Sequence, residues 1–212
     1  MTAQPEANVR MRRPMPPHRV YPDFLAPGEH AALLAWALAN QERFEHSQIK
    51  GKRVSPDVRR SLSLRDLGPT AEVLRTRLKA LAPTMVKDLR VTPFELSKIE
   101  LELIAHRHED KFGRHIDTFT GADVGAGGGR VLSCVYYFHR EPKAFDGGAL
   151  RIHAFGSEED AEFVDVEPRQ NTLLAFPAWA PHEVRSVSCP SDAFADARFS
   201  VNCWLHRARP EA

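Results

Sequence analysis

The sequence of 212 residues has little cysteine and no long apolar segment. Its three cysteines show no CxxC spacing, which excludes a disulfide framework and a cysteine zinc site. We interpret Cys134, Cys189 and Cys203 as buried thiols in a reducing compartment. No apolar run approaches the roughly 20 residues of a membrane-spanning helix, and the N-terminus lacks the apolar core of a secretory signal. We therefore expect a soluble, cytoplasmic protein without a membrane partner.

Net charge is also nearly absent, because 29 Lys and Arg stand against 28 Asp and Glu. Near-neutrality gives no support for nucleic acid as a partner, since no overall field would attract a polyanion. Histidine, in contrast, is abundant: the sequence has ten, and several of them are close to Asp or Glu in the sequence. The chemistry of these histidines is therefore what the sequence must explain.

The length and a hydrophobic content of 42% suit one domain with its own core. Residues 1–20 are rich in Pro and Arg and predict a flexible tail. Residues 21–212 predict a single domain, with a helical part over 21–93 and a barrel over 94–207. The sequence does not indicate an oligomeric state.

Two helices are predicted in the first part of the domain. Apolar residues at helical spacing predict one that ends near Asn40, and a second apolar face follows Pro69. Pro83 is expected to interrupt or kink the second helix. The basic residues 47–60 and the glycine-rich residues 121–129 predict loops, and both are candidate lids over a site.

After Pro93 the apolar period shortens to two. Lys98, Glu100 and Glu102 alternate with apolar residues, which predicts a strand with one face in water. Further β-rich runs follow at 112–119, 131–138, 149–155, 162–166, 172–176, 182–187 and 198–206. The sequence thus predicts a mainly β protein with flanking helices, a double-stranded β-helix (jelly-roll) barrel with the N-terminal helices packed on one sheet.

His115 and Asp117 are the most informative pair. Residues two apart on a strand point to the same face, so these side chains can share a metal ion. A surface pair at a strand end is the alternative. An iron site with open positions needs a third ligand, and His182, at the start of a strand, is favoured over His139 and His153.

The last strand presents an unusual alternation of an apolar face with a polar one. The polar face consists of Arg198, Ser200, Asn202 and Trp204. Such a row inside a small barrel is costly unless it binds a polar ligand, and a guanidinium matches a carboxylate bidentately. The alternative is a solvated face at a sheet edge.

The order of HxD, distal histidine and following arginine resembles the iron(II)- and 2-oxoglutarate-dependent dioxygenases, in particular their prolyl 4-hydroxylase-like branch. Three stretches look like segments of that branch: RVLSCVYYFHREPKAFDGGALRIHAF, VDVEPRQNTLLAFPAWAPHEV and ARFSVNCWLH. The resemblance spans roughly Leu96 to Arg207.

The resemblance implies a role for each matching position. His115, Asp117 and His182 would be the iron ligands, with no further catalytic residue. Co-substrate contacts would come from Arg198 and Tyr137 at the distal carboxylate and from Asn202 and Ser200, and Leu150 and Trp204 would be apolar walls of the co-substrate pocket. His106 stands where many relatives carry a tyrosine and is a further candidate contact.

The resemblance also implies a reaction. An unactivated C–H bond would be hydroxylated while 2-oxoglutarate is decarboxylated to succinate and CO2, with iron(II), 2-oxoglutarate, O2 and, as a further candidate, ascorbate. The substrate would be a peptidyl proline, in a peptide or protein, or an amino-acid-like small molecule. A non-catalytic metal-binding or sensing barrel and a cupin-type oxygenase without a keto acid are the alternatives.

Overall fold

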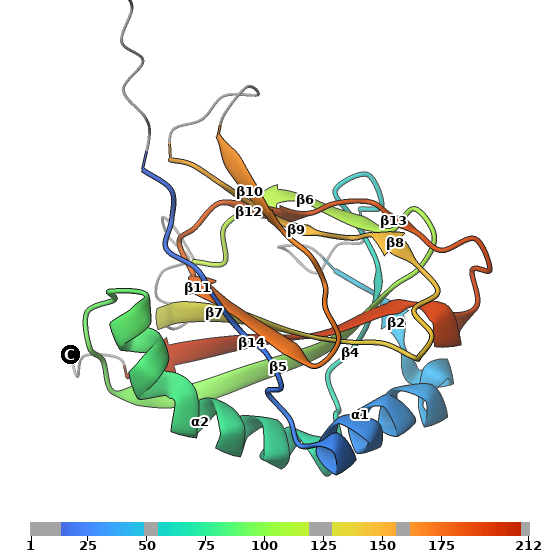
Figure 1. Ribbon diagram of the computed structural model, residues 1–212, viewed down its shortest axis with the longest axis horizontal. Helices are drawn as coiled ribbons and strands as arrows, with labels where there is room; N and C mark the ends of the chain where they lie inside the picture. The colour runs from blue at the N-terminus through green and yellow to red at the C-terminus, as the bar shows by residue number, and fades with distance from the viewer. Residues whose placement is uncertain (1–13, 49–54, 119–128, 156–161, 209–212) are drawn as a thin grey trace, which may run out of the picture.

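The computed structural model describes residues 14–48, 55–118, 129–155 and 162–208. Within them, two β-sheets lie over each other and helices cover the outer face of the larger sheet (Figure 1). The larger sheet has the order β1-β11-β7-β14-β5-β4-β2, the second sheet β10-β9-β12-β6-β3, and β13 pairs with β8. This architecture confirms the predicted mainly β jelly-roll with helices on one sheet.

The elements of the described residues have these bounds: β1 Arg19–Tyr21, α1 Pro27–Ala39, η1 Gln41–Arg43, β2 Glu45–His46, β3 Arg59–Arg60, β4 Leu62–Leu64, α2 Thr70–Asp88, β5 Leu96–His106, β6 Lys111–His115, β7 Gly129–Phe138, β8 Asp146–Gly147, β9 Leu150–His153, β10 Phe163–Val166, β11 Thr172–Pro177, β12 His182–Val184, β13 Val187–Ser188, η3 Phe194–Asp196 and β14 Arg198–Arg207.

The main core lies between the two helices and the larger sheet. Pro27 opens α1, where its missing N–H is harmless, and the Glu29 carboxylate accepts a hydrogen bond from the Ala26 N–H. Helix residues such as Leu33 and Leu74 pack with Leu103 of the sheet in one buried cluster. Burial of this apolar face is what holds the helices on the sheet.

The second helix is not interrupted at Pro83, although interruption is one of the two outcomes expected from the sequence. It continues through Pro83 to Asp88, although a proline removes one helical hydrogen bond. Ala82 and Met85, on either side of the turn that contains Pro83, are both buried in the core. Their packing outweighs the lost hydrogen bond, so the helix does not end where the proline predicts.

Two segments expected to lie outside regular structure are partly within it. Arg19–Tyr21 forms the edge strand β1, paired with β11, and Met15 packs against a second core cluster, so this part of the predicted tail lies on the barrel. Arg59–Arg60 forms β3, and the Arg59 side chain is buried, so the end of the predicted loop 47–60 is a strand. Residues 49–54 and 121–128 of the two predicted loops lie outside the described residues.

Strand β14 lies in the middle of the larger sheet, between β7 and β5, so its polar face is not at an edge. Arg198 pairs with His106, and Asn202 pairs with Glu102. These residues therefore share the inner face of the sheet, which is turned toward the smaller sheet. The prediction that the face of Glu102 lies in water was wrong, because Glu102 is only 4% exposed.

Among the described residues, no helix combines the length and the apolarity that crossing a membrane requires.

Candidate metal and co-substrate site

Three metal-ligating side chains converge between the sheets. His115 ends β6 and pairs directly with His182, the first residue of β12. The Asp117 N–H donates to the Ala178 carbonyl at 2.9 Å, which brings its carboxylate to the histidines. Asp117 Oδ1 lies 3.7 Å from His115 Nε2, and Oδ2 lies 3.7 Å from His182 Nε2. All three ligand atoms lie within 4.8 Å of one another.

Neighbouring groups orient each of these side chains. Nδ1 of His115 lies 2.8 Å from the Gly113 carbonyl, and Nδ1 of His182 lies 2.9 Å from the Ala180 carbonyl. A carbonyl can only accept, so Nδ1 carries the proton in both rings and Nε2 presents its lone pair to the centre. Such outer hydrogen bonds are typical of metal-ligating histidines.

The protonation states also suit a metal. Burial lowers the pKa of His115, and the neighbouring His182 lowers it further, which keeps the imidazole neutral. Burial alone would raise the pKa of Asp117, but the two imidazoles, the Ser133 hydroxyl at 2.6 Å and the Trp204 indole together lower it. The Nε2 atoms of His115 and His182 and the Asp117 carboxylate together form the donor set of a facial iron(II) site.

The competing histidines lie elsewhere. His139 Nδ1 is 3.0 Å from the carbonyl of Arg140. His153 Nε2 faces Glu183 at 3.6 Å. Neither belongs to the group of three ligands found in the described residues, so the geometry agrees with the choice of His182.

A cavity of about 760 Å³ adjoins the three ligands. At its inner end Arg198 is 1% exposed, with Nη1 at 3.3 Å from His106 Nδ1 and 3.5 Å from Ser200 Oγ. Nε and Nη2 of Arg198 and the hydroxyl of Tyr137 have no hydrogen-bond partner among the described residues, and the guanidinium lies 5.0 Å from the Tyr137 ring centre. Burial lowers the pKa of Arg198. Buried donors without partners indicate an anionic ligand.

The predicted co-substrate residues are placed consistently. Six of them line the cavity: His106, Leu150, Arg198, Ser200, Asn202 and Trp204. The seventh, Tyr137, does not line the cavity, but its ring lies against the Arg198 guanidinium. Six of the seven therefore surround one space together with the three metal ligands.

Gly148 is a residue that the sequence reasoning did not single out. Its φ is +68°, and a Cβ atom there would lie 2.5 Å from Arg198 Cδ. Glycine is therefore required both by the backbone and by the arginine side chain. The signal in the sequence is the Gly-Gly pair in the first of the three stretches that resemble the hydroxylase branch.

The outer end of the cavity carries charges that sequence reasoning also missed. Arg59 Nη2 lies 3.2 Å from Glu102, with both side chains less than a tenth exposed. Arg130 Nη2 lies 3.0 Å from Glu100, and its guanidinium lies 3.9 Å from the Trp204 ring centre. Trp204, expected as an apolar wall, thus also makes a cation–π contact with Arg130. His206, whose Nε2 lies 3.3 Å from Glu100 Oε2, and Arg130 lower the pKa of Glu100 to about 2, although burial alone would raise it.

Comparison with known proteins agrees with this geometry. The family model of the 2OG-Fe(II) oxygenase superfamily matches residues 101–206, half of the chain. The chain belongs to this superfamily. The match runs from β5 to β14 and includes all three ligands of the candidate metal centre.

Individual relatives point to hydroxylases. An uncharacterized PKHD-type hydroxylase of Synechocystis is 32% identical over 190 residues, covering 87% of this chain. The chain spans 61% of the length of that relative. A prolyl-4-hydroxylase of Pseudomonas putida has a TM-score of 0.66 at 20% identity, covering 91% of this chain and 94% of its own. A Trichoplax adhaerens prolyl hydroxylase, solved with a peptide of hypoxia inducible factor, has a TM-score of 0.69 at 16% identity, covering 90% and 83%.

Proposed function

We propose that the protein is an iron(II)- and 2-oxoglutarate-dependent hydroxylase that couples hydroxylation of an unactivated C–H bond to decarboxylation of 2-oxoglutarate. The observation that carries the proposal is the buried Arg198 guanidinium, with unpartnered donors, in the same cavity as the ligands His115, Asp117 and His182. A metal alone would not need that arginine. A dicarboxylate bound at the metal would need it.

Each residue then has a distinct task. The two histidines and Asp117 would hold iron(II) and leave positions open for the co-substrate and oxygen. Arg198 and Tyr137 would bind the distal carboxylate of 2-oxoglutarate, with Ser200 and Asn202 nearby. When bound, iron, 2-oxoglutarate and O2 supply the oxidising chemistry, and the protein supplies orientation and exclusion of water. No acid or base side chain is required.

His106 would be a further hydrogen-bond donor to the co-substrate. Its Nδ1 faces a guanidinium N–H of Arg198 and must accept, so its proton lies on Nε2, a buried atom without a partner among the described residues. Burial, Arg198 and Arg59 lower the pKa of His106 well below 6.5, which keeps the ring neutral. A neutral imidazole N–H would thus replace the tyrosine hydroxyl found in many relatives.

Peptidyl proline is the substrate class that we propose, because prolyl hydroxylases are among the similar structures and one of them is solved with a peptide. The outer end of the cavity contains Gln48, Val58 and Arg65, all of which line it from surface segments. This end would admit a peptide. A cytoplasmic location is part of the proposal and is supported by three free cysteines.

Anaerobic titration with iron(II) and 2-oxoglutarate tests the site. The expected result is a weak visible charge-transfer band that Asp117→Ala abolishes, that Arg198→Ala weakens, and that the exposed control Asp165→Ala leaves intact. Absence of the band, or a band indifferent to Asp117, would contradict the proposal.

Succinate release in air, measured with a panel of prolyl peptides and amino acids, then tests the reaction. Peptide-stimulated succinate is the expected result. A band without succinate under any condition would favour a non-catalytic barrel. Oxygen consumption independent of 2-oxoglutarate would favour a cupin-type oxygenase.

A further inference from the structure

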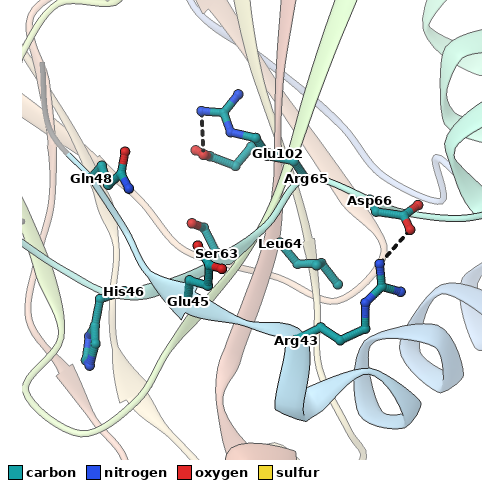
Figure 2. Close-up of a pocket in the computed structure, with 9 residues that line it drawn as sticks. All are labelled: Arg43, Glu45, His46, Gln48, Ser63, Leu64, Arg65, Asp66 and Glu102. Carbon is teal, nitrogen blue, oxygen red and sulfur yellow. Dashed lines mark hydrogen bonds and ion pairs between the residues drawn. The ribbon is translucent and has the colours of Figure 1, made fainter. Parts of the chain in front are cut away.

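A second cavity of about 510 Å³ adjoins the first (Figure 2). It lies among η1, β2 and the segment that follows β4, and it shares Gln48, Arg65 and Glu102 with the cavity that contains the metal ligands. The Glu102 side chain therefore lies at the boundary between the two. A ligand extending from the metal centre past Glu102 would enter the second cavity.

Glu102 has two counter-ions of very different character. Oε2 accepts from Arg59 Nη2 at 3.2 Å, and Oε1 lies 3.1 Å from Arg65 Nη2 (Figure 2). Arg59 is buried and fixed, since it also donates to the Gln48 carbonyl at 3.2 Å and lies over the ring of Phe112. Arg65 is 71% exposed, although the Glu102 carboxylate is 5% exposed, and Arg65 Nη1 also donates to Glu100 Oε1 at 3.4 Å.

The exposed counter-ion is the replaceable one. An ion pair whose cation is largely in solvent contributes little, because hydration competes with it and the long side chain loses freedom on pairing. The buried Glu102 carboxylate, in contrast, keeps Arg59 on Oε2 when Arg65 leaves, and its Oε1 is then open to another cation. Arg65 therefore occupies a place at Glu102 that another guanidinium or ammonium can take.

The remaining charges of the second cavity favour a cation over an anion. Arg43 is committed to Asp66, with Nη2 at 2.7 Å, and its Nη1 donates to Asn40. Glu45, on β2 opposite Ser63 of β4, forms no ion pair in the described part of the chain. When Arg65 turns away, Glu45 and Glu102 face the cavity without a mobile counter-ion among the described residues.

We propose that the second cavity binds a basic side chain, arginine or lysine, of a peptide substrate whose hydroxylated residue lies at the metal centre, and that this side chain replaces Arg65 at Glu102. The inference rests on the proposed function, because it requires a peptide substrate. Glu102 and Glu45 determine specificity, and Arg65 holds the place of the substrate cation when no peptide is bound. An arginine would pair with the Glu102 carboxylate through parallel hydrogen bonds.

The test uses blocked proline peptides of alanine in which one arginine is moved from three positions before to three positions after the proline. Matched peptides carry citrulline, which keeps the shape without the charge, or glutamate. Peptide binding is measured anaerobically by the change in the visible band, and turnover by succinate. At one arginine position, we expect a KM about tenfold below that of the citrulline peptide, as for a charge-assisted hydrogen bond.

Variants of the protein sharpen the test. Arg65→Ala is expected to lower the KM of the arginine peptide several-fold, because the competing cation is gone, and to leave that of the citrulline peptide unchanged. Glu45→Gln and Glu102→Gln are expected to remove the preference for arginine, and Glu45→Gln serves if the buried Glu102→Gln fails to fold. Arg75→Ala, an exposed arginine on α2, is the matched control.

The outcomes separate the two proposals. Absence of the visible band overturns the proposed function itself. A normal band without any preference for arginine over citrulline, or without a response to any peptide, overturns the basic subsite alone. A preference for glutamate that Arg65→Ala removes would instead identify Arg65 as a binder of anions and would also overturn it.

Discussion

The two faces of the seven-stranded sheet differ completely, although they are built from alternate residues of the same strands. The outer face, with Leu103 and Val201, is apolar and packs on α1 and α2. The inner face lines the cavity and carries buried polar side chains, such as Glu102, Arg198 and Ser200, beside apolar ones such as Val135. The outer face therefore holds the fold together, while the inner face keeps polar groups buried for a ligand.

Adjacent tyrosines on β7 show the contrast most directly. The Tyr136 hydroxyl, on the outer face, donates to Asn171 at 2.8 Å and lies 2.8 Å from His30 Nδ1. The Tyr137 hydroxyl, on the inner face, is buried without a partner among the described residues. Burial raises the pKa of both hydroxyls. The Tyr136 hydroxyl therefore stabilises the fold, whereas the Tyr137 hydroxyl is available to bind the co-substrate.

The largest expected effect is on the outer face. Leu103→Ala should lower the free energy of unfolding by about 3 kcal/mol, because a fully buried leucine leaves a cavity. The affinity of the folded protein for 2-oxoglutarate should stay within about twofold, since the side chain does not line the site. Urea unfolding and anaerobic calorimetric titration measure the two quantities. A large loss of affinity would show that the faces are not separable.

On the inner face, Arg198→Met should reverse this pattern. We expect the affinity for 2-oxoglutarate to fall about 100-fold, because charge-assisted hydrogen bonds to the distal carboxylate are lost. The free energy of unfolding without ligand should be unchanged or about 1 kcal/mol higher, because a buried charge without a carboxylate partner is removed. A marked loss of stability in urea would contradict the assignment of Arg198 to a ligand.

The tyrosine pair provides the matched comparison at smaller scale. Tyr137→Phe should weaken 2-oxoglutarate binding about tenfold and leave stability nearly unchanged. Tyr136→Phe should cost about 1 kcal/mol of stability, because His30 and Asn171 lose a partner, and leave binding unchanged. Urea unfolding and anaerobic calorimetric titration with 2-oxoglutarate measure the two effects. Exchanged results for the two variants would refute the division of the sheet into a structural outer face and a ligand-binding inner face.

The smallest effect concerns pH. The pKa of His106 in the folded protein lies well below 6.5. As the pH falls through 6.5, His106 therefore binds a proton in the unfolded chain but not in the folded protein. Stability must therefore decrease on acidification. For this one group the decrease is about 1 kcal/mol between pH 6.5 and 5.5.

In the protein without metal, His106→Gln should remove that part of the slope. Urea unfolding at a series of pH values measures the difference. An identical slope in wild type and His106→Gln would show that His106 is not held neutral by the fold.

The sequence predicted that the inner face of β14 lines a polar ligand site, because burying Arg198, Ser200 and Asn202 in an apolar core would be costly. It failed on the inner face of β5, since alternation alone does not distinguish a face in water from a face in a cavity. The roles of Arg59 and Gly148 depend on which side chains lie opposite them across the barrel. Those contacts come from strand pairing between distant segments, which local patterns do not contain.

The most direct test compares 2-oxoglutarate with 2-oxopentanoate, which has the same keto acid and chain length but lacks the distal carboxylate. Affinities for both are measured anaerobically with iron(II) in wild type and in Arg198→Met. A preference of about 100-fold for 2-oxoglutarate in wild type, lost in Arg198→Met, is the predicted result. Equal affinities in wild type, or a preference that survives in Arg198→Met, would contradict the assignment of the inner face to a dicarboxylate at the metal.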